Sequence, residues 1–587
     1  MRWIPRDVPD ETAAAALATE ARVSPIIARL LIARGIRGAA EAQRFLAPSF
    51  SHLHSPFLML GMRQAAERLR AAIARKEKIL IYGDYDADGT IAVVVLKTAI
   101  ELCGGSCEYH VPHRIRDGYG MKDDVLERAA AEGVRLIISV DTGIRAFAAG
   151  ETARRLGLDL IVTDHHLPQA DGVPHAVAVL NPNQLGCEYP CKALCGAGVA
   201  FKLAQAIMES AGLARLLPSF LKVVAIATIA DAVPLVGENR VFAKLGLEAL
   251  RKPVNPGLKA LLEVAQVNGG RTLTTGEVAF RLAPRLNAAG RMDVARDVID
   301  LFSVRDVGQA KTIAERLNRL NSERQEEEQR ILHEIDARLA EDRALRDAWC
   351  MVVDGESWHK GVIGIAASRL LDRYSRPVLV ITRDGAEAQG SARSIDAFHM
   401  LEALESCAHL FTRFGGHKHA AGFALPSDRI GELRAHLDAR ARACLRPEDL
   451  QPTLVCDAEI ALNQVSSALY TDLCRMEPFG MGNPEPVFVA RRVLLVAPPH
   501  IVKDKHVKLR VRQATSGTAT PRSIPRVFDA LGWRLAERVA QDGISERDSL
   551  DLAFTVVENC HPDFGGLELS VCDFARSAVA TANTDKS

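Results

Sequence analysis

Residues 79–90 read ILIYGDYDADGT, and this stretch decides the fold of the first part of the chain. Its apolar start is typical of a buried strand, after which Asp84, Asp86 and Asp88 stand at alternate positions. In an extended chain alternate side chains point the same way, so a strand end can direct several carboxylates at hard cations. Carboxylates this close repel one another unless cations neutralise them. The stretch therefore predicts a metal site, followed by a buried helix over residues 91–102.

Apolar strands alternate with helical segments from residue 78 to about residue 180. This alternation predicts a mainly parallel sheet covered by helices on both faces, with ligands bound beyond the carboxyl ends of the strands. Three further polar groups follow the pattern: Asp141 after strand 135–140, Asp164-His165-His166 after strand 159–163, and Asp231 at the end of an apolar helix. We expect the first two groups to reach the same sheet edge as the three aspartates of the opening stretch.

The kinds of ligand side chain at this edge indicate which metal ion would bind there. Carboxylates mixed with one or two imidazoles favour Mn²⁺ or Mg²⁺ over zinc, which prefers Cys and His. Two such ions together activate water for in-line attack on a phosphodiester, and Asp141, alone on the middle strand, is the candidate to bridge them. A single Asp at a strand end is as often a helix cap, but convergence of the whole set favours a metal centre.

One alternative concerns the opening stretch alone. Asp86-Ala87-Asp88-Gly89-Thr90 also fits the DxDGT signature of haloacid-dehalogenase-type phosphatases, whose first Asp is a nucleophile that forms an aspartyl-phosphate. That interpretation leaves Asp84 and the Asp-His-His triplet without a role. A site with two metal ions uses all of them.

Length and pattern together predict several domains, because 587 residues exceed one ordinary domain. The predicted ranges are a leader that packs on the next domain (1–50), a catalytic α/β domain (51–311), a long charged connecting helix (312–347), a smaller α/β domain (348–450), a small β-barrel (451–578) and a disordered tail (579–587). Short strands separated by Gly, Pro and Ser turns indicate the barrel.

Composition limits which partners and which cellular compartment we expect for this chain. Lys plus Arg and Asp plus Glu number 73 each, so any nucleic-acid surface must be a local patch. The N-terminal stretch lacks an apolar signal core, and no run of about 18 apolar residues predicts a membrane span. We therefore expect a cytoplasmic protein with no membrane partner. The 12 cysteines are predicted to be reduced, and Cys187, Cys191 and Cys195 lack the spacing of a metal site.

The motifs YGDYDADG, DTG, DHH after an apolar strand, and Asp231 together resemble the DHH phosphoesterase superfamily. Nearly all of residues 50–580 resemble its single-strand-specific 5′→3′ exonucleases. The resemblance implies an α/β fold with a parallel-sheet DHH domain, a long connecting helix, a smaller DHH-associated α/β domain that binds substrate, and a C-terminal OB-like β-barrel. It also implies two cation sites, one with Asp88, Asp141, His165 and Asp231, the other with Asp86 and Asp141, with Asp84 nearby. His166 would face the scissile phosphate. Asp164 would orient a histidine without binding a cation itself.

The same resemblance implies the residues that bind substrate: Arg114, Arg291, Ser391 and Arg393 for the terminal phosphate or neighbouring backbone, and His417 for substrate positioning. Guanidinium groups suit phosphate geometry, and glycine-rich stretches at 390–394 and 415–422 allow the backbone to approach an anion closely. The alternative for each arginine is an ordinary surface salt bridge.

A local basic surface is predicted in the C-terminal module. Between residues 501 and 526 the chain has seven Lys or Arg and one acid. The strand VKLRVR places its three cations on one face: Lys508, Arg510 and Arg512. An OB fold would use such a face to follow single-stranded nucleic acid, although alternating cations also protect exposed strands from aggregation. Phe528 and Trp533 have apolar neighbours and are expected in the core.

These features predict divalent-metal-dependent hydrolysis of single-stranded DNA 5′→3′ to mononucleotides, in DNA repair and recombination. The polarity and the biological role rest on the resemblance alone. Two ions, Mn²⁺ or Mg²⁺, are expected, and the expected partners of a monomeric chain are single-stranded DNA, a single-strand-binding protein and a helicase. Two other functions remain open: a DHH phosphodiesterase of short oligonucleotides or cyclic dinucleotides, which needs no barrel, and a non-catalytic single-strand-binding replication scaffold. The second is disfavoured because no motif member is missing.

Overall fold

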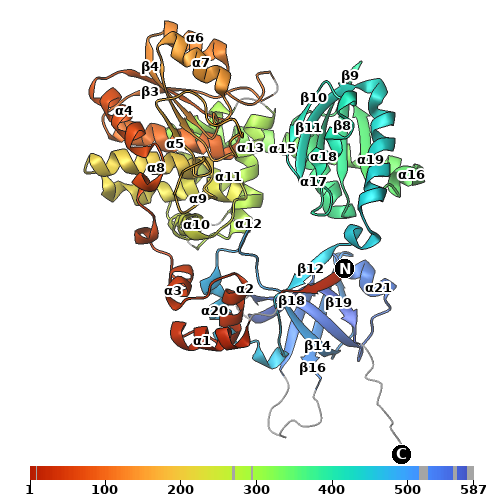
Figure 1. Cartoon of the computed structure of the whole chain (residues 1–587). Helices are drawn as coiled ribbons and strands as arrows, with labels where there is room; N and C mark the ends of the chain where they lie inside the picture. Colours follow the sequence, from red (N-terminus) through yellow and green to blue (C-terminus); the bar gives the residue numbers. More distant parts are fainter. Residues whose placement is uncertain are drawn as a thin grey trace, which may run out of the picture. The chain divides into compact units, whose positions relative to one another are not determined.

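The computed structural model describes residues 1–7, 10–114, 116–267, 271–292, 295–514, 526–559 and 565–577. The predicted tail, residues 579–587, lies outside the described residues. The chain forms two compact units (Figure 1). The central unit is Ser49–Gln451, and the terminal unit combines Met1–Pro48 with Pro452–Ser587.

A five-stranded parallel sheet lies in the central unit. Its order is β3-β2-β4-β5-β6, and the strands are β2 (Lys78–Tyr82), β3 (Cys107–His110), β4 (Val134–Val140), β5 (Asp159–Thr163) and β6 (Ala178–Leu180). The chain runs from β2 to β3 on one side and then crosses to β4 on the other, so the strand order reverses between β2 and β4. Ligands of open α/β sheets bind beyond the carboxyl ends of the strands at such a point.

Helices cover both faces of this sheet (Figure 1). Those on one face are α4 (Met62–Ala74), α5 (Ala87–Leu102) and α8 (Gly196–Ser210), and those on the other are α6 (Asp123–Ala131) and α7 (Phe147–Leu156). Each face has its own apolar cluster, which is why β4 is apolar along almost its whole length. The predicted parallel sheet with helices on both faces is confirmed.

Further helices extend the larger of these two clusters. They are α9 (Leu221–Ala230), α10 (Gly237–Ala249), α11 (Pro256–Val264), α12 (Thr275–Glu277), a π-helical segment (Val278–Leu282), α13 (Ala283–Met292) and α14 (Arg296–Ser303). Helix α9 ends at Asp231, and Arg291 lies in the last turn of α13. This helical layer thus carries two of the predicted site residues.

The connecting helix α15 spans Val307–Glu341. It begins earlier than predicted because the Asp306 carboxylate caps it by accepting the N–H of Gln309 at 2.8 Å. It also ends earlier than predicted, at Glu341. The next residue, Asp342, is the N-cap of a separate short helix, α16 (Arg343–Arg346). The first apolar residues of α15 join the cluster of the parallel sheet, and the last ones join that of the next domain. The helix therefore connects two cores.

The smaller α/β domain has a five-stranded sheet in the order β10-β11-β9-β8-β7. Its strands are β7 (Met351–Glu356), β8 (Val378–Asp384), β9 (Glu387–Arg393), β10 (Arg413–Gly416) and β11 (Ala420–Pro426), and only β7 and β8 pair in parallel. Helix α17 (Ile363–Tyr374) covers one face, and α18 (Met400–Glu405) and α19 (Ile430–Cys444) cover the other. The glycine-rich stretches 390–394 and 415–422 fall on neighbouring strands of this sheet.

The N-terminal segment packs differently from the prediction that it lies on the following domain. Strand β1 (Arg2–Pro5) pairs with β12 (Thr453–Cys456), and the helices that follow are α1 (Glu11–Ala21), α2 (Pro25–Ala33) and α3 (Ala39–Leu46). Leu30 and Leu31 of α2 are fully buried in one cluster with Leu469 and Leu473. The apolar face of α2 was readable from the sequence, but its partner, more than 400 residues away, was not.

The C-terminal part of the terminal unit is a ring of β-strands. Its strands are β13 (Ala458–Glu459), β14 (Phe488–Leu495), β15 (His500–Val502), β16 (His506–Gln513), β17 (Val527–Gly532), β18 (Ser549–Asn559) and β19 (Gly566–Arg576), with α20 (Ser467–Met476) and α21 (Ala536–Gln541) beside them. The order is β13-β14-β18-β19-β17-β16-β15, and β14 also pairs with β16, which closes the ring. Phe528 lies in its core as expected, but Trp533 is 59% exposed.

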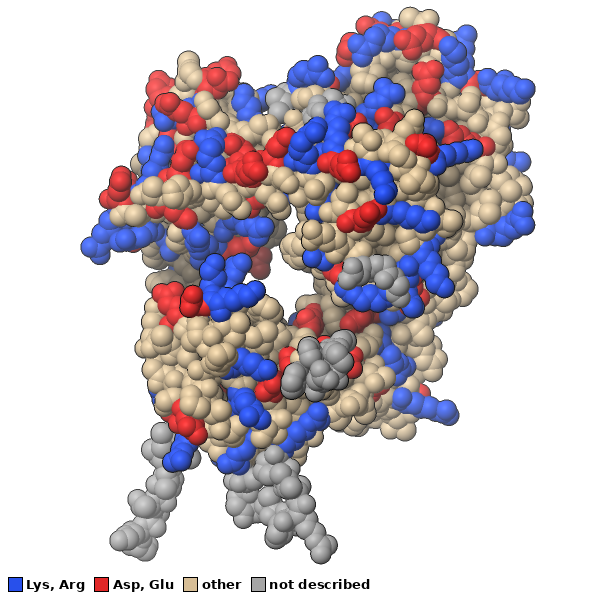
Figure 2. Space-filling model, turned by 180° about the vertical axis from the view of Figure 1, so that it is seen from behind, with Lys and Arg blue, Asp and Glu red and all other residues tan. Residues whose placement is uncertain are grey.

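Three general features agree with the composition. None of the helices in the described residues is both long and apolar enough to cross a membrane. The described cysteines are free thiols, and Cys187, Cys191 and Cys195 are buried in the core of the central unit. Figure 2 shows basic and acidic side chains interleaved over the face that it presents, as expected from equal numbers of each.

Candidate metal centre

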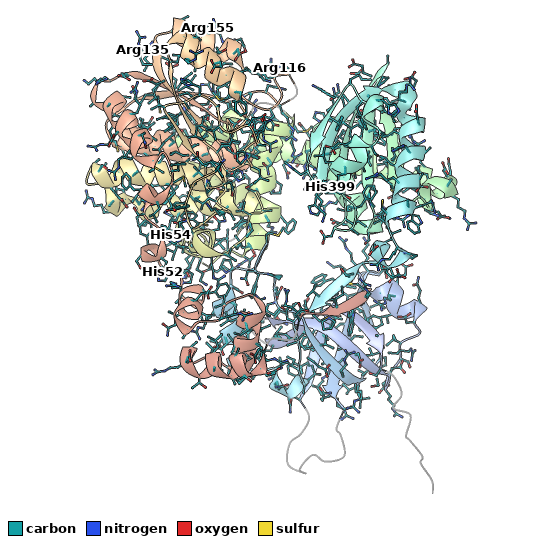
Figure 3. All side chains as sticks on the ribbon, viewed as in Figure 1. His52, His54, Arg116, Arg135, Arg155 and His399 are labelled. Carbon is teal, nitrogen blue, oxygen red and sulfur yellow. The ribbon has the colours of Figure 1, made fainter. Side chains whose placement is uncertain are left out.

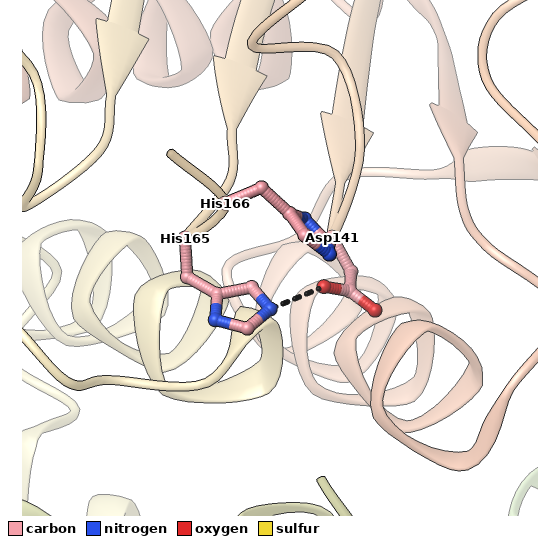
Figure 4. A group of neighbouring side chains, drawn as sticks. All are labelled: Asp141, His165 and His166. Atoms are coloured by element: carbon pink, nitrogen blue, oxygen red, sulfur yellow. Dashed lines mark ion pairs between the residues drawn. The ribbon is translucent and has the colours of Figure 1, made fainter. Parts of the chain in front are cut away.

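The predicted ligands meet at the carboxyl edge of the parallel sheet. Asp84 follows β2, Asp141 follows β4, the Asp-His-His triplet follows β5, and Asp231 ends α9. Three sets of side chains each bring their ligand atoms within 4.8 Å of one another: Asp84, Asp86 and Asp141; Asp88, His165 and Asp231; and Asp141, His165 and His166. Figure 4 shows the last of these sets.

Asp86 and Asp88 reach this edge by a different route from the extended chain that we expected. Strand β2 ends at Tyr82, and α5 begins at Ala87. Asp86 is the N-cap of this helix and accepts the N–H of Gly89 at 2.9 Å, and Asp88 lies in the first turn. A helix N-terminus favours negative charge, so helix geometry and not strand alternation directs these two carboxylates.

A second helix N-terminus holds Asp88. Its two carboxylate oxygens accept the N–H of Gly196 at 2.6 Å and that of Ala197 at 2.9 Å, at the start of α8. A Cβ on Gly196 would stand 2.5 Å from the Cβ of Asp141, so only glycine fits between the two aspartates. Sequence reasoning missed Gly196, and the only signal for it was the glycine-rich start of an apolar helix, CGAG.

Asp141 occupies the middle of the cluster. Its φ of 59° is left-handed, a strained conformation for a residue other than glycine and one that clusters at functional sites. Its N–H donates to the Thr163 carbonyl at 2.9 Å, which ties the loop after β4 to the end of β5. Nε2 of His165 lies 3.2 Å from its Oδ1, as marked in Figure 4. The same Nε2 lies 3.9 Å from Asp88 and 3.8 Å from Asp231.

The cluster carries more negative charge than the described residues neutralise. Burial and the neighbouring Asp86 raise the pKa of Asp84 to about 8, and burial and Asp88 raise the pKa of Asp231 to about 9. Burial and the other aspartates also raise the pKa of Asp141 well above its ordinary value. Oδ1 of Asp84, Oδ1 of Asp141 and Oδ2 of Asp231 have no hydrogen-bond partner among the described residues. Buried, unpartnered carboxylate oxygens beside an imidazole are a donor set that fits divalent cations.

The pKa values of the two adjacent histidines are shifted in opposite directions. Burial lowers the pKa of His165 despite the nearby Asp88, so its ring is neutral and free to act as a ligand. Burial also opposes charge on His166, but the hydrogen bond from its Nδ1 to Asp164, 2.7 Å long, outweighs this effect and raises its pKa. Asp164 is fully buried and also accepts the N–H of Ile144, at 2.9 Å. Asp164 therefore holds the His166 ring beside the carboxylate cluster, in surroundings that favour its charged form.

The predicted arginines gather next to the metal cluster and lack the salt bridges of the alternative interpretation. Among the described residues, Arg114, Arg291 and Arg393 form no ion pair with a carboxylate. Arg114 lies over the ring of Tyr85, 4.9 Å from its centroid. Burial and the charge of Arg114 lower the pKa of Arg291 to about 10, and the same two causes lower the pKa of Arg393. Cations that repel one another and have no carboxylate partner define an anion site.

Each arginine is oriented by a neighbour. Arg291 donates to the Gly361 carbonyl at 3.0 Å, and Arg393 donates to the Ser391 hydroxyl at 3.1 Å, so the helical layer and the smaller α/β domain share this site. Arg116, labelled in Figure 3, is exposed on the same loop as Arg114.

Two cavities adjoin the cluster. One, of about 350 Å³, is lined by the aspartates, by Arg114 and Arg291, and by Asn287, whose side-chain oxygen accepts the N–H of Ala87 at 2.8 Å. The other, of about 470 Å³, is lined by His166 and by His417 of the smaller domain. Tyr119 lines both cavities. Neither Asn287 nor Tyr119 was a candidate from the sequence, although each lies within five residues of a predicted arginine, Arg291 and Arg114 respectively.

The basic face of the terminal unit is exposed as the alternation predicted. On β16, Lys508, Arg510 and Arg512 face outward, and the residues between them are buried in the core. Asp529 of β17 lies 2.8 Å from Lys508 and 3.6 Å from Arg510. The charge of this face is thus partly neutralised from within the sheet.

The sheet, the clustered aspartates and the Asp-His-His triplet define a DHH phosphoesterase. Family models match in three places: "DHH family, N-terminal domain" at residues 78–228, "DHHA1 domain" at 348–443 and "RecJ OB domain" at 456–573. The chain is 35% identical over 517 residues to the single-stranded-DNA-specific exonuclease RecJ of Escherichia coli, covering 85% of this chain and 88% of the relative. It belongs to the RecJ family of single-stranded-DNA-specific exonucleases.

Other relatives agree. RecJ of Bacillus subtilis is 38% identical over 522 residues, which cover 88% of this chain and 65% of that longer relative. The crystal structure of Thermus thermophilus RecJ in complex with Mn²⁺ matches 98% of this chain and 80% of its own, with a TM-score of 0.82 and 27% identity. A RecJ from the same organism was also solved with Mg²⁺, with a TM-score of 0.75 and 26% identity over 99% of this chain and 79% of its own.

Proposed function

We propose that this chain is a two-metal exonuclease that hydrolyses single-stranded DNA from its 5′ end and releases mononucleotides. The observation that carries the proposal is a group of buried carboxylates, three of whose oxygens have no hydrogen-bond partner among the described residues, in a member of the RecJ family. Arg114 and Arg291 line the same cavity and, within the described part of the chain, form no ion pair. The carboxylates fit cations, and the arginines fit an anion. A DNA strand with a terminal phosphate supplies that anion.

For the metals, we assign one cation to Asp88, Asp141, His165 and Asp231, and the other to Asp86 and Asp141, with Asp84 nearby. The proximity of these ligand atoms supports both sets. Mn²⁺ and Mg²⁺ are the ions proposed, because the donor set is rich in carboxylates. Bound ions of this kind lower the pKa of water and stabilise charge on a phosphate.

The chain's own residues complete the site. His166 is held by Asp164 at the wall of the larger cavity, where a ring N–H can donate to the scissile phosphate and stabilise negative charge that develops there. Asp164 fixes the orientation of that ring through the 2.7 Å hydrogen bond. His417, which lines the same cavity, positions the strand.

The arginine site explains why cleavage starts at a strand end. The residues proposed to bind the terminal phosphate or the neighbouring backbone are Arg114, Arg291, Ser391 and Arg393. A guanidinium fork matches phosphate oxygens, and desolvation strengthens the interaction. The 5′ polarity itself follows the family resemblance.

The remaining proposals concern the whole protein. The part of the central unit before α15 is proposed to be the catalytic domain, α15 the connector, residues 348–450 the substrate-binding domain, and residues 451–578 a domain that holds the strand through Lys508, Arg510 and Arg512. We further propose that the chain acts as a monomer in the cytoplasm, in DNA repair and recombination, with a single-strand-binding protein and a helicase as partners.

The test is digestion of single strands labelled at either end, with Mn²⁺ and Mg²⁺ in turn. The proposal expects early release of a labelled mononucleotide from the 5′-labelled strand, slow loss of the 3′ label, resistance of duplex, and no cleavage in EDTA. Early release of the 3′ label would overturn the polarity. Comparable rates on dinucleotides, cyclic dinucleotides and long strands would indicate a phosphodiesterase of small substrates, and tight binding without hydrolysis would indicate a scaffold.

A further inference from the structure

The outer face of β16 and β17 ends in an aromatic pair, Trp533 and the partly buried His506. Trp533 follows β17 directly and is 59% exposed. Its ring centroid lies 4.7 Å from that of His506, at an interplanar angle of 75°. His506 is held in turn, because its Nδ1 accepts the N–H of Arg534 at 3.0 Å. The indole is therefore supported from one side and open to solvent on another.

This pair lies on the same face as the three cations of β16. Successive residues of a strand alternate between faces, so His506, at the start of β16, shares its face with Lys508, Arg510 and Arg512. The antiparallel register of β16 and β17 pairs Val507 with Gly532, which places Trp533 beside His506. The face thus has a fixed order: an aromatic platform at one end, followed by the row of cations.

The spacing of this row suits a polynucleotide. Alternate residues on a strand are about 6.6 Å apart, close to the separation of consecutive phosphates in an extended single strand. An exposed indole ring offers a flat face on which a base can stack, and a base is the flat group that accompanies the regularly spaced phosphates of a single strand. An acidic peptide would supply charge without flat rings at that interval.

Asp529 adds a second feature. Its two carboxylate oxygens pair with Lys508 at 2.8 Å and with Arg510 at 3.6 Å, whereas Arg512 forms no ion pair among the described residues. A phosphate that binds Lys508 or Arg510 must compete with this carboxylate. Asp529 therefore lowers the affinity of the face for a polyanion and reduces the number of counterions that binding releases.

We propose that Trp533, supported by His506, is a stacking platform for one base of a single strand whose phosphates follow Lys508, Arg510 and Arg512, and that Asp529 limits the affinity of this face. The proposal extends the proposed function by naming where the terminal unit holds a base. It concerns binding only and does not depend on hydrolysis.

The test is equilibrium binding of a fluorescent oligo(dT) to the full chain in EDTA, so that no cleavage occurs. Trp533→Ala is expected to weaken binding about tenfold with an unchanged salt dependence, because stacking releases no counterions. Trp533→Phe should keep most of the affinity, which also controls for folding. Met481→Ala, which truncates another exposed apolar side chain of the terminal unit, should bind as the unchanged protein does.

An abasic strand and an Asp529 variant complete the design. On a strand that lacks bases, Trp533→Ala should bind as tightly as the unchanged chain, because there is no base to stack. Asp529→Asn should tighten binding to oligo(dT) several-fold and steepen its salt dependence. Equal affinity of Trp533→Ala and the unchanged chain for oligo(dT), or an equal loss on the abasic strand, would overturn the platform. Binding that depends on Trp533 in a chain that fails to hydrolyse DNA would support the platform and reject the proposed catalysis.

Discussion

The metal edge of the parallel sheet and the basic face of β16 both concentrate like charges, but in opposite environments. At the metal edge, Asp84, Asp88 and Asp141 are nearly fully buried, and oxygens of the first and last have no hydrogen-bond partner among the described residues. On the basic face, Lys508 is partly exposed and Arg510 is largely exposed, and both pair with Asp529.

Burial and compensation decide what each kind of charge indicates. A buried, uncompensated carboxylate costs free energy, so its presence already indicates a missing cation. An exposed, compensated cation costs little and indicates a ligand only when spacing and neighbours agree. Substitutions at the metal edge should therefore act strongly on chemistry, and substitutions on the basic face should act mildly on binding.

The largest effect is expected for Asp141→Asn, which removes the carboxylate shared by both proposed cations while it keeps the size of the side chain. The rate of single-strand hydrolysis should fall by on the order of 10³-fold or more, and affinity for the strand should largely survive. Asp123→Asn, an exposed helix residue of the same domain, is the matched control. Near-full activity of the Asp141 variant would break the contrast between the two regions.

The second prediction concerns the stability of metal-free protein. The pKa of Asp231, about 9 in the folded state, is above its unfolded value, so the folded chain keeps a proton that the unfolded chain loses. Stability should therefore fall as pH rises from 6 to 8, by roughly tenfold per pH unit in the unfolding constant for this one group.

Calorimetric melting in EDTA and in saturating Mg²⁺ checks this prediction. The melting temperature of the metal-free central unit should drop by several degrees over that pH range, and Mg²⁺ should remove the drop because it takes the place of the retained protons. A melting temperature that does not depend on pH in EDTA would show that the buried carboxylates are compensated in some other way.

The third prediction separates the arginine site from the metals. Arg393→Ala should reduce kcat/KM on a 5′-phosphorylated strand by roughly 30-fold, in the range of one lost charge-assisted contact, and should change it little on a 5′-hydroxyl strand. Arg413→Ala, an exposed arginine on the same sheet, should leave both rates unchanged. An equal loss on the two strands would remove terminal-phosphate recognition from Arg393.

The smallest effect is expected when Lys508, Arg510 and Arg512 are changed together to Ala. Single-strand affinity in EDTA should fall about tenfold at low salt, and the slope of log affinity against log salt should flatten by up to about two units, since each phosphate contact contributes roughly 0.7. A control chain with Arg343→Ala and Arg346→Ala loses two exposed cations elsewhere. If the salt-dependence slope of the triple variant matched that of the control, these three cations would serve only to keep the strand soluble and would not bind DNA.

The sequence alone predicted the architecture well where the periodicity was strong. Strands β2, β4 and β5 and the residues after them were predictable, because apolar runs ending in acidic motifs have few other interpretations. The start of α5 was misjudged, since Asp86 was treated as part of an extended chain although Asp is a common N-cap.

What the sequence could not supply was contact between distant elements. Gly196 and Asn287 reach the metal cluster from helices more than 100 residues from the opening stretch. The exposure of Trp533 depends on the register of β17 against β16, which apolar neighbours do not reveal. Residues of this kind are found only when the elements are placed in space.

We propose that the sheet edge binds two cations that share Asp141 as a ligand. Calorimetric titration of Mn²⁺ into metal-free protein measures this binding. We expect two ions per chain for the unchanged protein and loss of tight binding of both for Asp141→Asn. A single ion or none in the unchanged chain, or two tightly bound ions in the variant, would show that Asp141 does not join two cation sites.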